Sequence, residues 1–364
     1  MKIFLITNHS FMLYKFRKEL IQKLLQKHQV TLVMPAREYT DEFKEMGCSI
    51  IDIDVDRRGL NPLKDLHLLH QYKQLLRQHR PEMVLTYSIK PNIYAGIAAA
   101  KLDIPYCANI TGLGTAFQKK ILADFITILY RVAFRKVKTV FFENKDNLDE
   151  FLKRSILKEN QTCLLHGAGV NLEEFSYKTY PKEKTTNFVF VGRIMKEKGI
   201  DELLAAFRKL ESNHYNVHLD IVGPFEDDYE EEMKKLENDP CCSYCGFQRD
   251  VRPFLSKASC LVLPSYHEGM ANTILEAASC GRAVIASDIP GCKEGIIDQK
   301  SGFLVKTKDT EDLYNKMVQF VMLSNDEKEQ MGKNGRKLME KKFDKFVIVK
   351  KTIRYIESLN SGFF

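Results

Sequence analysis

Short apolar segments alternate with amphipathic helical segments along the whole chain, and this series starts twice. The first series opens with IFLI at residues 3–6, and the second opens with NFVFVG at residues 187–192. A strand, a helix and a second strand in succession fold into a parallel sheet with helices on its faces. The sequence therefore predicts two α/β domains with parallel, doubly wound sheets, joined near the polar, lysine-rich residues 177–187. Strands are expected at residues 3–6, 30–34, 49–53, 83–87, 106–110, 139–143, 187–192, 218–223, 260–264, 283–287 and 302–305.

The length and composition fit two such domains. The chain has 364 residues, too many for one ordinary hydrophobic core, and its apolar fraction of 44% is ordinary for a soluble globular protein. It contains no run of about 18 uncharged apolar residues, so no transmembrane helix is expected. The first residues, MKIFLITNHS, lack a small-residue cleavage site and are expected to form a strand, not a signal peptide.

The cysteines indicate the cellular compartment, and the charges indicate the class of partner. Nine cysteines are scattered, and Cys242 with Cys245 makes one C-x-x-C without a second pair, so we expect a reducing cytosol and no zinc site. Residues 1–180 hold 27 Lys and Arg against 19 Asp and Glu, whereas the remainder is near neutral. An anionic partner for the N-terminal half is therefore expected. No nucleic-acid-binding signature accompanies the charge, so nucleic acid is not expected.

A basic loop follows the first strand of the second series. In VGRIMKEKGIDELLAAF, residues 191–207, the strand is expected to end at Gly192 and a helix to begin near Asp201. The loop between them carries Arg193 and Lys198. A guanidinium fork and an ammonium charge beside a helix N-terminus can hold two phosphate oxygens. The alternative interpretation is a solvated basic loop.

Two carboxylates frame the most informative segment, SYHEGMANTILEAASCGRAVIAS at residues 265–287. Glu268 lies in a turn after an expected strand, and Glu276 lies in the helical run that follows. The carboxyl end of a strand is where open α/β sheets bind ligands, and a helix N-terminus there favours phosphate. The two Glu side chains can accept from separate hydroxyl groups, so the ligand expected is phosphorylated and polyhydroxylated. The alternative is a pair of solvated surface glutamates.

These two segments resemble the donor-binding elements of the family 4 glycosyltransferases. The shared patterns are G-R-x(4)-K-G from Gly192 and P-S-x(2)-E-G-x(6)-E-A at residues 264–277, and HGAGVNLEEF at residues 166–175 resembles the junction between their domains. The resemblance implies the GT-B fold, two facing Rossmann-like domains with an interdomain cleft. It implies an N-terminal acceptor- and membrane-facing domain of residues 1–170 plus 346–364, and a donor domain of residues 171–345.

The resemblance also assigns roles in the donor site. Arg193 and Lys198 would hold the diphosphate of a sugar nucleotide, Glu276 would accept from the ribose hydroxyls, and Glu268 would contact the donor sugar. It further implies retention of anomeric configuration, no metal and no cofactor beyond the UDP-sugar co-substrate. Glu268, Arg193 and Lys198 are the expected catalytic residues. The expected donor-binding set is Gly192, Arg193, Lys198, Glu268, Gly269, Met270, Ala271, Asn272 and Glu276.

The N-terminal half resembles a branch that builds bacterial surface polysaccharides or undecaprenyl-diphosphate-linked oligosaccharides. The resemblance is carried by residues 9–20, 57–66, 88–106 and 110–117, although Asn8-His9-Ser10 replaces the usual Gly-Gly loop. It implies a lipid-linked or polysaccharide acceptor, with ordinary surface cations as the alternative interpretation of the basic positions. The expected acceptor-binding set is His9, Arg17, Arg57, Lys90, Thr111 and Gly112.

Residues 117–142 bear on location. Apolar residues such as Ile121, Phe125 and Ile128 fall near one helical stripe, with Arg131 and Arg135 close by. Such a helix suits an anionic membrane surface, which predicts a cytoplasmic protein peripheral on the inner face of the membrane. A helix facing the domain core is the alternative, and both hold if only one edge meets lipid.

The sequence thus predicts transfer of a hexose or N-acetylhexosamine from a UDP-sugar to a lipid-diphosphate-linked sugar. Two other functions stay open: a sugar-nucleotide 2-epimerase of the same fold, and a non-catalytic nucleotide-sugar binding module. The acids of IDIDVD, residues 51–56, alternate at a strand end in the other half, so a metal there is not expected. His267 is expected to be a polar loop side chain, and no general base is assigned.

Overall fold

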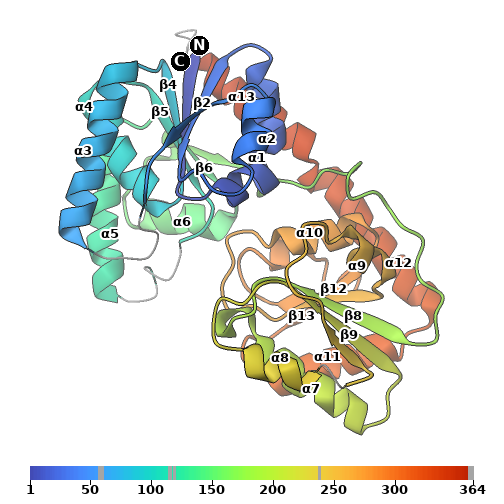
Figure 1. The fold of residues 1–364 in the computed structure, drawn as a ribbon. Coiled ribbons are helices and arrows are strands. Elements are labelled where there is room, and N and C mark those ends of the chain that lie inside the picture. Colours follow the sequence, from blue (N-terminus) through green and yellow to red (C-terminus); the bar gives the residue numbers. More distant parts are fainter. Residues whose placement is uncertain (56–60, 114–116, 118–119, 237–238, 360–364) are drawn as a thin grey trace. The chain divides into compact units, whose positions relative to one another are not determined.

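In the computed structural model the chain forms two units (Figure 1). The structure describes residues 1–55, 61–113, 117, 120–236 and 239–359. Unit 1 comprises Met1–Ala168 with Lys345–Phe364, and unit 2 comprises Gly169–Asp344. Among the described residues no helix is long and apolar enough to span a bilayer.

Unit 1 is built on a seven-stranded parallel sheet. Its order is β3-β2-β1-β4-β5-β6-β7, so the direction of strand addition reverses between β1 and β4. The strands are β1 (Lys2–Ile6), β2 (Gln29–Met34), β3 (Ser49–Asp52), β4 (Met83–Tyr87), β5 (Tyr106–Ile110), β6 (Thr139–Phe142) and β7 (Thr162–Leu164).

Helices cover both faces of this sheet (Figure 1). Alternate residues of β1 point to opposite faces: Ile3 and Leu5 into one core, Phe4 and Ile6 into the other. The first core is closed by α1 (Ser10–Leu25), α2 (Thr40–Glu45) and α13 (Lys345–Ser358). The second is closed by α3 (Pro62–His79), η1 (Pro91–Ala95), α4 (Gly96–Lys101), α5 (Lys120–Ala133) and α6 (Lys145–Lys153). Because both faces are covered, these strands are almost continuously apolar.

Unit 2 repeats this plan with six parallel strands in the order β10-β9-β8-β11-β12-β13. The reversal here lies between β8 and β11. The strands are β8 (Thr186–Val191), β9 (Val217–Val222), β10 (Cys242–Tyr244), β11 (Cys260–Leu263), β12 (Ala283–Ser287) and β13 (Gly302–Val305). The helices are α7 (Ile200–Ser212), α8 (Glu230–Leu236), α9 (Arg252–Lys257), α10 (Asn272–Ser279), α11 (Thr310–Val321) and α12 (Asn325–Leu338).

The α/β fold class with two parallel sheets is confirmed. The chain leaves unit 1 after Ala168 and returns to it at Lys345. Within unit 2 these two passages lie side by side, since the Val170 N–H donates to the Phe343 carbonyl at 2.8 Å. The final helix α13 then packs on α1 of unit 1, where Ile356 is fully buried.

Candidate functional site

In unit 2 the loops after β8 and β11 lie at the point where the strand order reverses. Open α/β sheets bind their ligands at the carboxyl ends of strands at such a point. The loop after β8 contains η4 (Lys196–Lys198), and the loop after β11 leads into α10. The Tyr266 N–H donates to the Glu197 carbonyl at 2.8 Å, so the two loops are bonded to each other.

Gly199 allows these two loops to approach closely. It is the N-cap residue directly before α7 and has a φ of +72°, a left-handed conformation that glycine adopts without strain. A Cβ atom at this position would collide with the carbonyl oxygen of Pro264, the residue that follows β11. The G-R-x(4)-K-G pattern therefore ends in glycine because no side chain fits between the loops.

The approach of the loops brings Lys198 and Glu268 into contact. The Lys198 ammonium forms an ion pair with Glu268 Oε1, and the Ser265 hydroxyl donates to the same oxygen at 2.8 Å. Both charged side chains are mostly buried, at 17% and 11% exposure. Two residues separated by 70 positions thus form one charged centre in the part of unit 2 that binds ligands in this class of sheet.

The backbone around Glu268 is held by the loop after β12. The Ala271 N–H donates to the Gly291 carbonyl at 2.8 Å. Gly291 has a φ of +87°, and a Cβ there would lie 2.6 Å from the Gly269 carbonyl oxygen. Residues 268–271 are therefore positioned by close backbone packing, with Met270 and Ala271 buried.

Helix α10 directs its N-terminus into the same region. The residue before it, Ala271, has no side chain able to cap the helix. The Ile274 N–H donates to the Ala271 carbonyl at 3.0 Å, whereas the earlier N–H groups of a first helical turn lack intrahelical acceptors. With the helix dipole, they favour an anion. Asn272 Oδ1 is buried without a hydrogen-bond partner, while its Nδ2 donates to the Met270 carbonyl. Glu276 lies one turn further along, half-buried.

Arg193 has a different ion-pair partner from Lys198 and Glu268. It follows Gly192 after β8 and forms an ion pair of 3.3 Å with Glu226, with 43% of its side chain exposed. The structure therefore brings Lys198, Glu268 and the start of α10 together and gives Arg193 a separate acidic partner. Sequence reasoning missed Ser265 and Glu226, although Ser265 belongs to the P-S-x(2)-E-G pattern.

Four of the expected acceptor residues, His9, Lys90, Thr111 and Gly112, follow central strands of unit 1. His9 follows β1 and precedes α1, with its N–H bonded to Thr7 Oγ1 at 3.4 Å. Lys90 follows β4 and pairs with Asp65 of α3 at 2.7 Å, largely buried. Thr111 and Gly112 follow β5 and are half-buried. Arg57 lies outside the described residues.

Arg17 is the acceptor candidate with the most specific environment. Its guanidinium is buried, forms an ion pair with Glu143 at the end of β6, and lies 5.3 Å from the ring centre of Tyr87. Burial raises the pKa of the Glu143 carboxyl, and Arg17 opposes that rise. A diphosphate can bind Arg17 only by displacing or sharing this contact. Sequence reasoning missed Glu143, although its place at the end of an expected strand was a usable signal.

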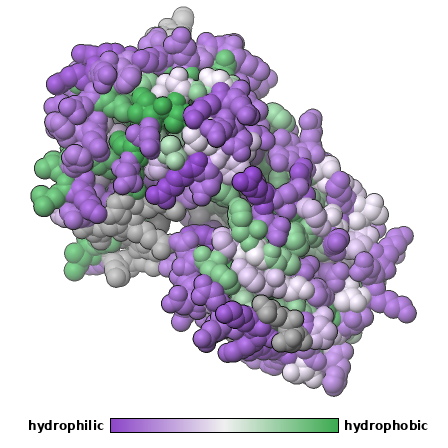
Figure 2. Space-filling view, viewed as in Figure 1, coloured by the Kyte–Doolittle hydropathy of each residue, from purple (hydrophilic) through white to green (hydrophobic). Residues whose placement is uncertain are grey.

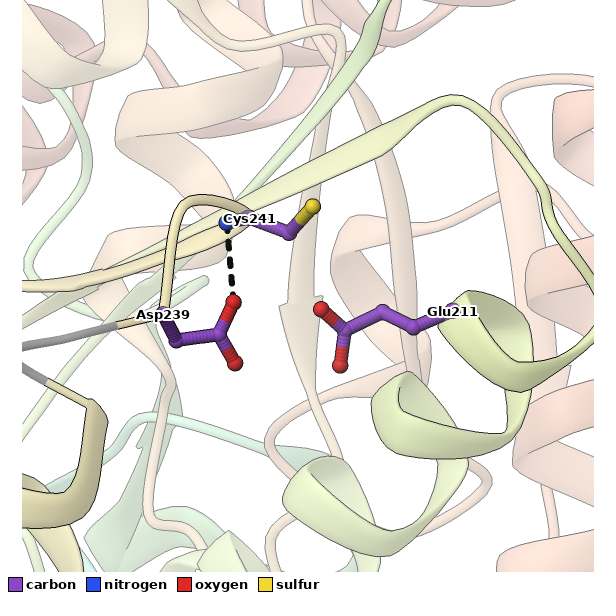
Figure 3. A group of neighbouring side chains, drawn as sticks. All are labelled: Glu211, Asp239 and Cys241. Carbon is purple, nitrogen blue, oxygen red and sulfur yellow. Dashed lines mark hydrogen bonds between the residues drawn. The ribbon is translucent and has the colours of Figure 1, made fainter.

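One group of possible metal ligands occurs among the described residues (Figure 3). It consists of Glu211 at the end of α7 with Asp239 and Cys241 before β10. Burial and then the charge of Asp239 raise the pKa of Glu211, and burial raises the pKa of the Cys241 thiol. The group precedes β10, so it lies at the amino-end edge of the sheet, opposite Lys198 and Glu268.

Two family models match the chain, one in each half. The description "Glycosyl transferases group 1" matches residues 172–338, and "Glycosyl transferase 4-like" matches residues 2–144. Together they account for most of both units.

Two curated relatives are similar over most of their length. The N,N'-diacetylbacillosaminyl-diphospho-undecaprenol alpha-1,3-N-acetylgalactosaminyltransferase of Campylobacter jejuni is 28% identical over 347 residues, 90% of each chain. The UDP-Gal:alpha-D-GlcNAc-diphosphoundecaprenol alpha-1,3-galactosyltransferase of Escherichia coli is 26% identical over 285 residues, 72% of each chain.

A solved structure shows the same fold. Anabaena Alr3699/HepE in complex with UDP and glucose superposes with a TM-score of 0.81, covering 98% of this chain and 100% of that one at 16% identity. At that identity the likeness concerns the fold alone.

Proposed function

The chain belongs to the group 1 glycosyl transferases, and on that premise we propose that it moves one hexose or N-acetylhexosamine from a UDP-sugar to a lipid-diphosphate-linked sugar. The proposal includes retention of anomeric configuration and needs no metal. The names of the Campylobacter and Escherichia relatives support this acceptor class, since both specify a diphospho-undecaprenol sugar. The acceptor would place the protein on the inner face of the cytoplasmic membrane, in surface polysaccharide or glycan assembly.

The observation that carries the proposal is the Lys198–Glu268 pair beside the start of α10. An arriving diphosphate offers Lys198 a second anionic partner and offers the first N–H groups of α10 an acceptor. As Lys198 turns to the diphosphate, Glu268 is released to accept from hydroxyl groups of the donor sugar. Binding of the donor thus exchanges one ion pair of Lys198 for another, and hydrogen bonds from sugar hydroxyl groups replace the ion pair at the Glu268 carboxylate.

The same groups suit the chemical step. When the bond between the anomeric carbon and the diphosphate breaks, negative charge grows on the departing phosphate. Lys198 and the α10 N–H groups would already face the diphosphate at that moment, so they would stabilise the charge without reorganising, and Arg193 would join them by leaving Glu226. Glu268 would orient the sugar, and the acceptor hydroxyl would lose its proton to the departing phosphate. No separate general base is required by this scheme.

The test is transfer by purified protein from a panel of UDP-sugars to a prenyl-diphosphate-linked sugar, with the product anomer determined by NMR. We expect Glu268→Gln to lower kcat by about 10²–10³-fold, the range seen when a polar group acting on the transition state is removed. Lys198→Met is expected to weaken UDP binding by about tenfold or more. Glu311→Gln is the matched control, because Glu311 forms an exposed ion pair with Lys209 away from this site. Full activity of Glu268→Gln would remove the catalytic assignment.

Two controls separate the other functions. Incubation of a UDP-sugar without acceptor should leave the sugar unchanged, whereas a 2-epimerase would produce its epimer. Binding of UDP without turnover of any lipid-diphosphate sugar would favour a non-catalytic module. Addition of EDTA is expected to change the transfer rate by less than about twofold, and a larger loss reversed by Mg²⁺ or Mn²⁺ would contradict a metal-free diphosphate site.

A further inference from the structure

Helix α5 of unit 1 has apolar residues on two opposite faces. Ala123, Ile126 and Tyr130 are buried, and Ile126 and Tyr130 pack into the core beneath the helix. The opposite face carries Ile121, Phe125, Ile128 and Val132, which we call the apolar ridge. Because successive helical residues are about 100° apart, positions spaced by 4, 3 and 4 fall on one narrow strip about 16 Å long. A helix that only closed a domain core would need no second apolar face.

The apolar ridge is exposed to a degree that is unusual for large side chains. Ile121 is 88% exposed, Ile128 57%, and Phe125 and Val132 54% each. The first turn of α3 adds two more such residues, Leu63 at 79% and Leu66 at 64%.

Helices α3 and α5 cover the same face of the sheet, and both pack against η1 (Figure 1). Hydrophobic residues gather at the edge of unit 1 where these helices lie (Figure 2). Large exposed apolar side chains that gather on one face of a helix mark a site of interaction.

The charges beside the apolar ridge indicate the kind of partner. Lys120, Arg131, Arg135 and Lys138 are all exposed at or just beyond the ends of α5. Asp124, the acid on this helix, forms an ion pair with Arg154 at 3.2 Å. The surface is therefore apolar along its centre and cationic at its ends, and unit 1 belongs to the half of the chain with the excess of Lys and Arg.

We propose that the apolar ridge and the first turn of α3 insert into the interfacial layer of an anionic bilayer, with α5 lying parallel to the membrane. Apolar side chains would enter the boundary of the acyl chains while Lys and Arg contact lipid phosphates. A second copy of this chain is a poorer occupant, since two such faces would bring like charges together. The inference rests on the proposed function, which places the acceptor's lipid in the same bilayer.

The absence of tryptophan from the chain permits a direct test. In Phe125→Trp, insertion should shift the indole emission to shorter wavelength when vesicles of phosphatidylglycerol and phosphatidylcholine are added. Lipids brominated on the acyl chains should then quench that emission. Met322→Trp is the matched control, because Met322 is 72% exposed in unit 2, and its emission should not respond. An unchanged Phe125→Trp spectrum would overturn the proposal.

Partitioning of unlabelled protein gives a second measurement. The double change Phe125→Ser and Ile128→Ser removes two half-exposed apolar side chains, so we expect vesicle affinity to fall by about tenfold or more, against no change for Met322→Ser. Both positions are exposed, so thermal unfolding should be unaffected. Equal affinity of the double variant would overturn the proposal, as would a blue shift that needs raised protein concentration and no lipid, which would indicate self-association.

The assay also separates this inference from the proposed function. With a water-soluble, short-chain prenyl diphosphate sugar, the double variant should transfer at the wild-type rate. With the full-length lipid acceptor in vesicles it should be slower by about the same factor as its loss of binding. If neither acceptor is used by the wild-type protein while Phe125→Trp still inserts, the function fails and the membrane surface stands.

Discussion

Arg17 and Glu143 place opposite charges inside unit 1, and removal of either partner alone should be costly. Arg17→Met would leave the buried Glu143 carboxylate without its cation. Breaking a buried ion pair in this way costs about 3–5 kcal/mol of unfolding free energy. Urea denaturation is the measurement. Adding Glu143→Leu to Arg17→Met should recover part of the loss, and a smaller loss in Arg17→Met than in Lys209→Met, at an exposed pair, would contradict this account.

The same carboxyl gives a pH dependence of defined sign. Burial raises the pKa of Glu143 above its unfolded value of about 4.3, so the folded protein holds this proton more tightly than the unfolded chain. Its contribution to stability is therefore complete below the unfolded pKa and is lost as pH rises through the folded pKa. Comparison of urea midpoints from pH 4 to 8 should show wild type losing stability relative to Glu143→Gln as pH rises. A difference that stays constant or reverses would contradict the raised pKa.

Single residues differ in how far sequence could assign them. Lys198 and Glu268 stood in recognisable patterns beside expected strand ends, and the structure brings them into contact. Arg193 stood in the same pattern, yet its contact with Glu226 depends on how the loop after β9 returns, which no local spacing encodes. The partner of Arg17 is 126 positions away, so only the assembled strand order could identify it.

At the scale of loops and helices, the close approach of two loops at Gly199 can be tested against a second glycine, Gly246. Gly199 and Gly246 both have a left-handed φ, +72° and +64°, but a Cβ at Gly246 would meet nothing within 4 Å. Gly246→Ala should therefore show only the backbone strain, about 1 kcal/mol, whereas Gly199→Ala must also push Pro264 away. We expect Gly199→Ala to lose UDP binding and at least about 2 kcal/mol of stability, measured by calorimetry and urea denaturation. Equal effects of the two changes would refute the close-approach explanation.

The secondary elements show where sequence patterns stop being informative. Most of the longer strands were expected because they are runs of mainly apolar residues. The three-residue edge strands β7 and β10 were missed, since three residues cannot display a period. Helix α5 was expected to carry one apolar stripe that could face either the core or lipid. The structure shows apolar residues on both faces of the helix. The sequence alone did not indicate which apolar residues belong to which face.

At the scale of the whole molecule, each unit has its own core, and the donor and acceptor assignments fall on different units. The repeated alternation of strands and helices sufficed to predict two parallel sheets, because that alternation leaves few other arrangements. The strand order was not predictable from periodicity. The strand order reverses direction between β1 and β4 and between β8 and β11. These two points determine which loops can form ligand sites.

Because the chain returns to unit 1, we expect its last helix, α13, to stabilise unit 1 without affecting unit 2. Ile356 of α13 is fully buried in the core shared with α1, so Ile356→Ala should cost about 2–5 kcal/mol. Val347→Ala, at a 63% exposed position of the same helix, is the control and should have little effect. Hydrogen exchange should show Ile356→Ala losing protection in α1 and β1 but not in β8 or β11, with UDP affinity unchanged by calorimetry. Loss of UDP binding in parallel with unit 1 stability would mean that the donor site is not formed by unit 2 alone.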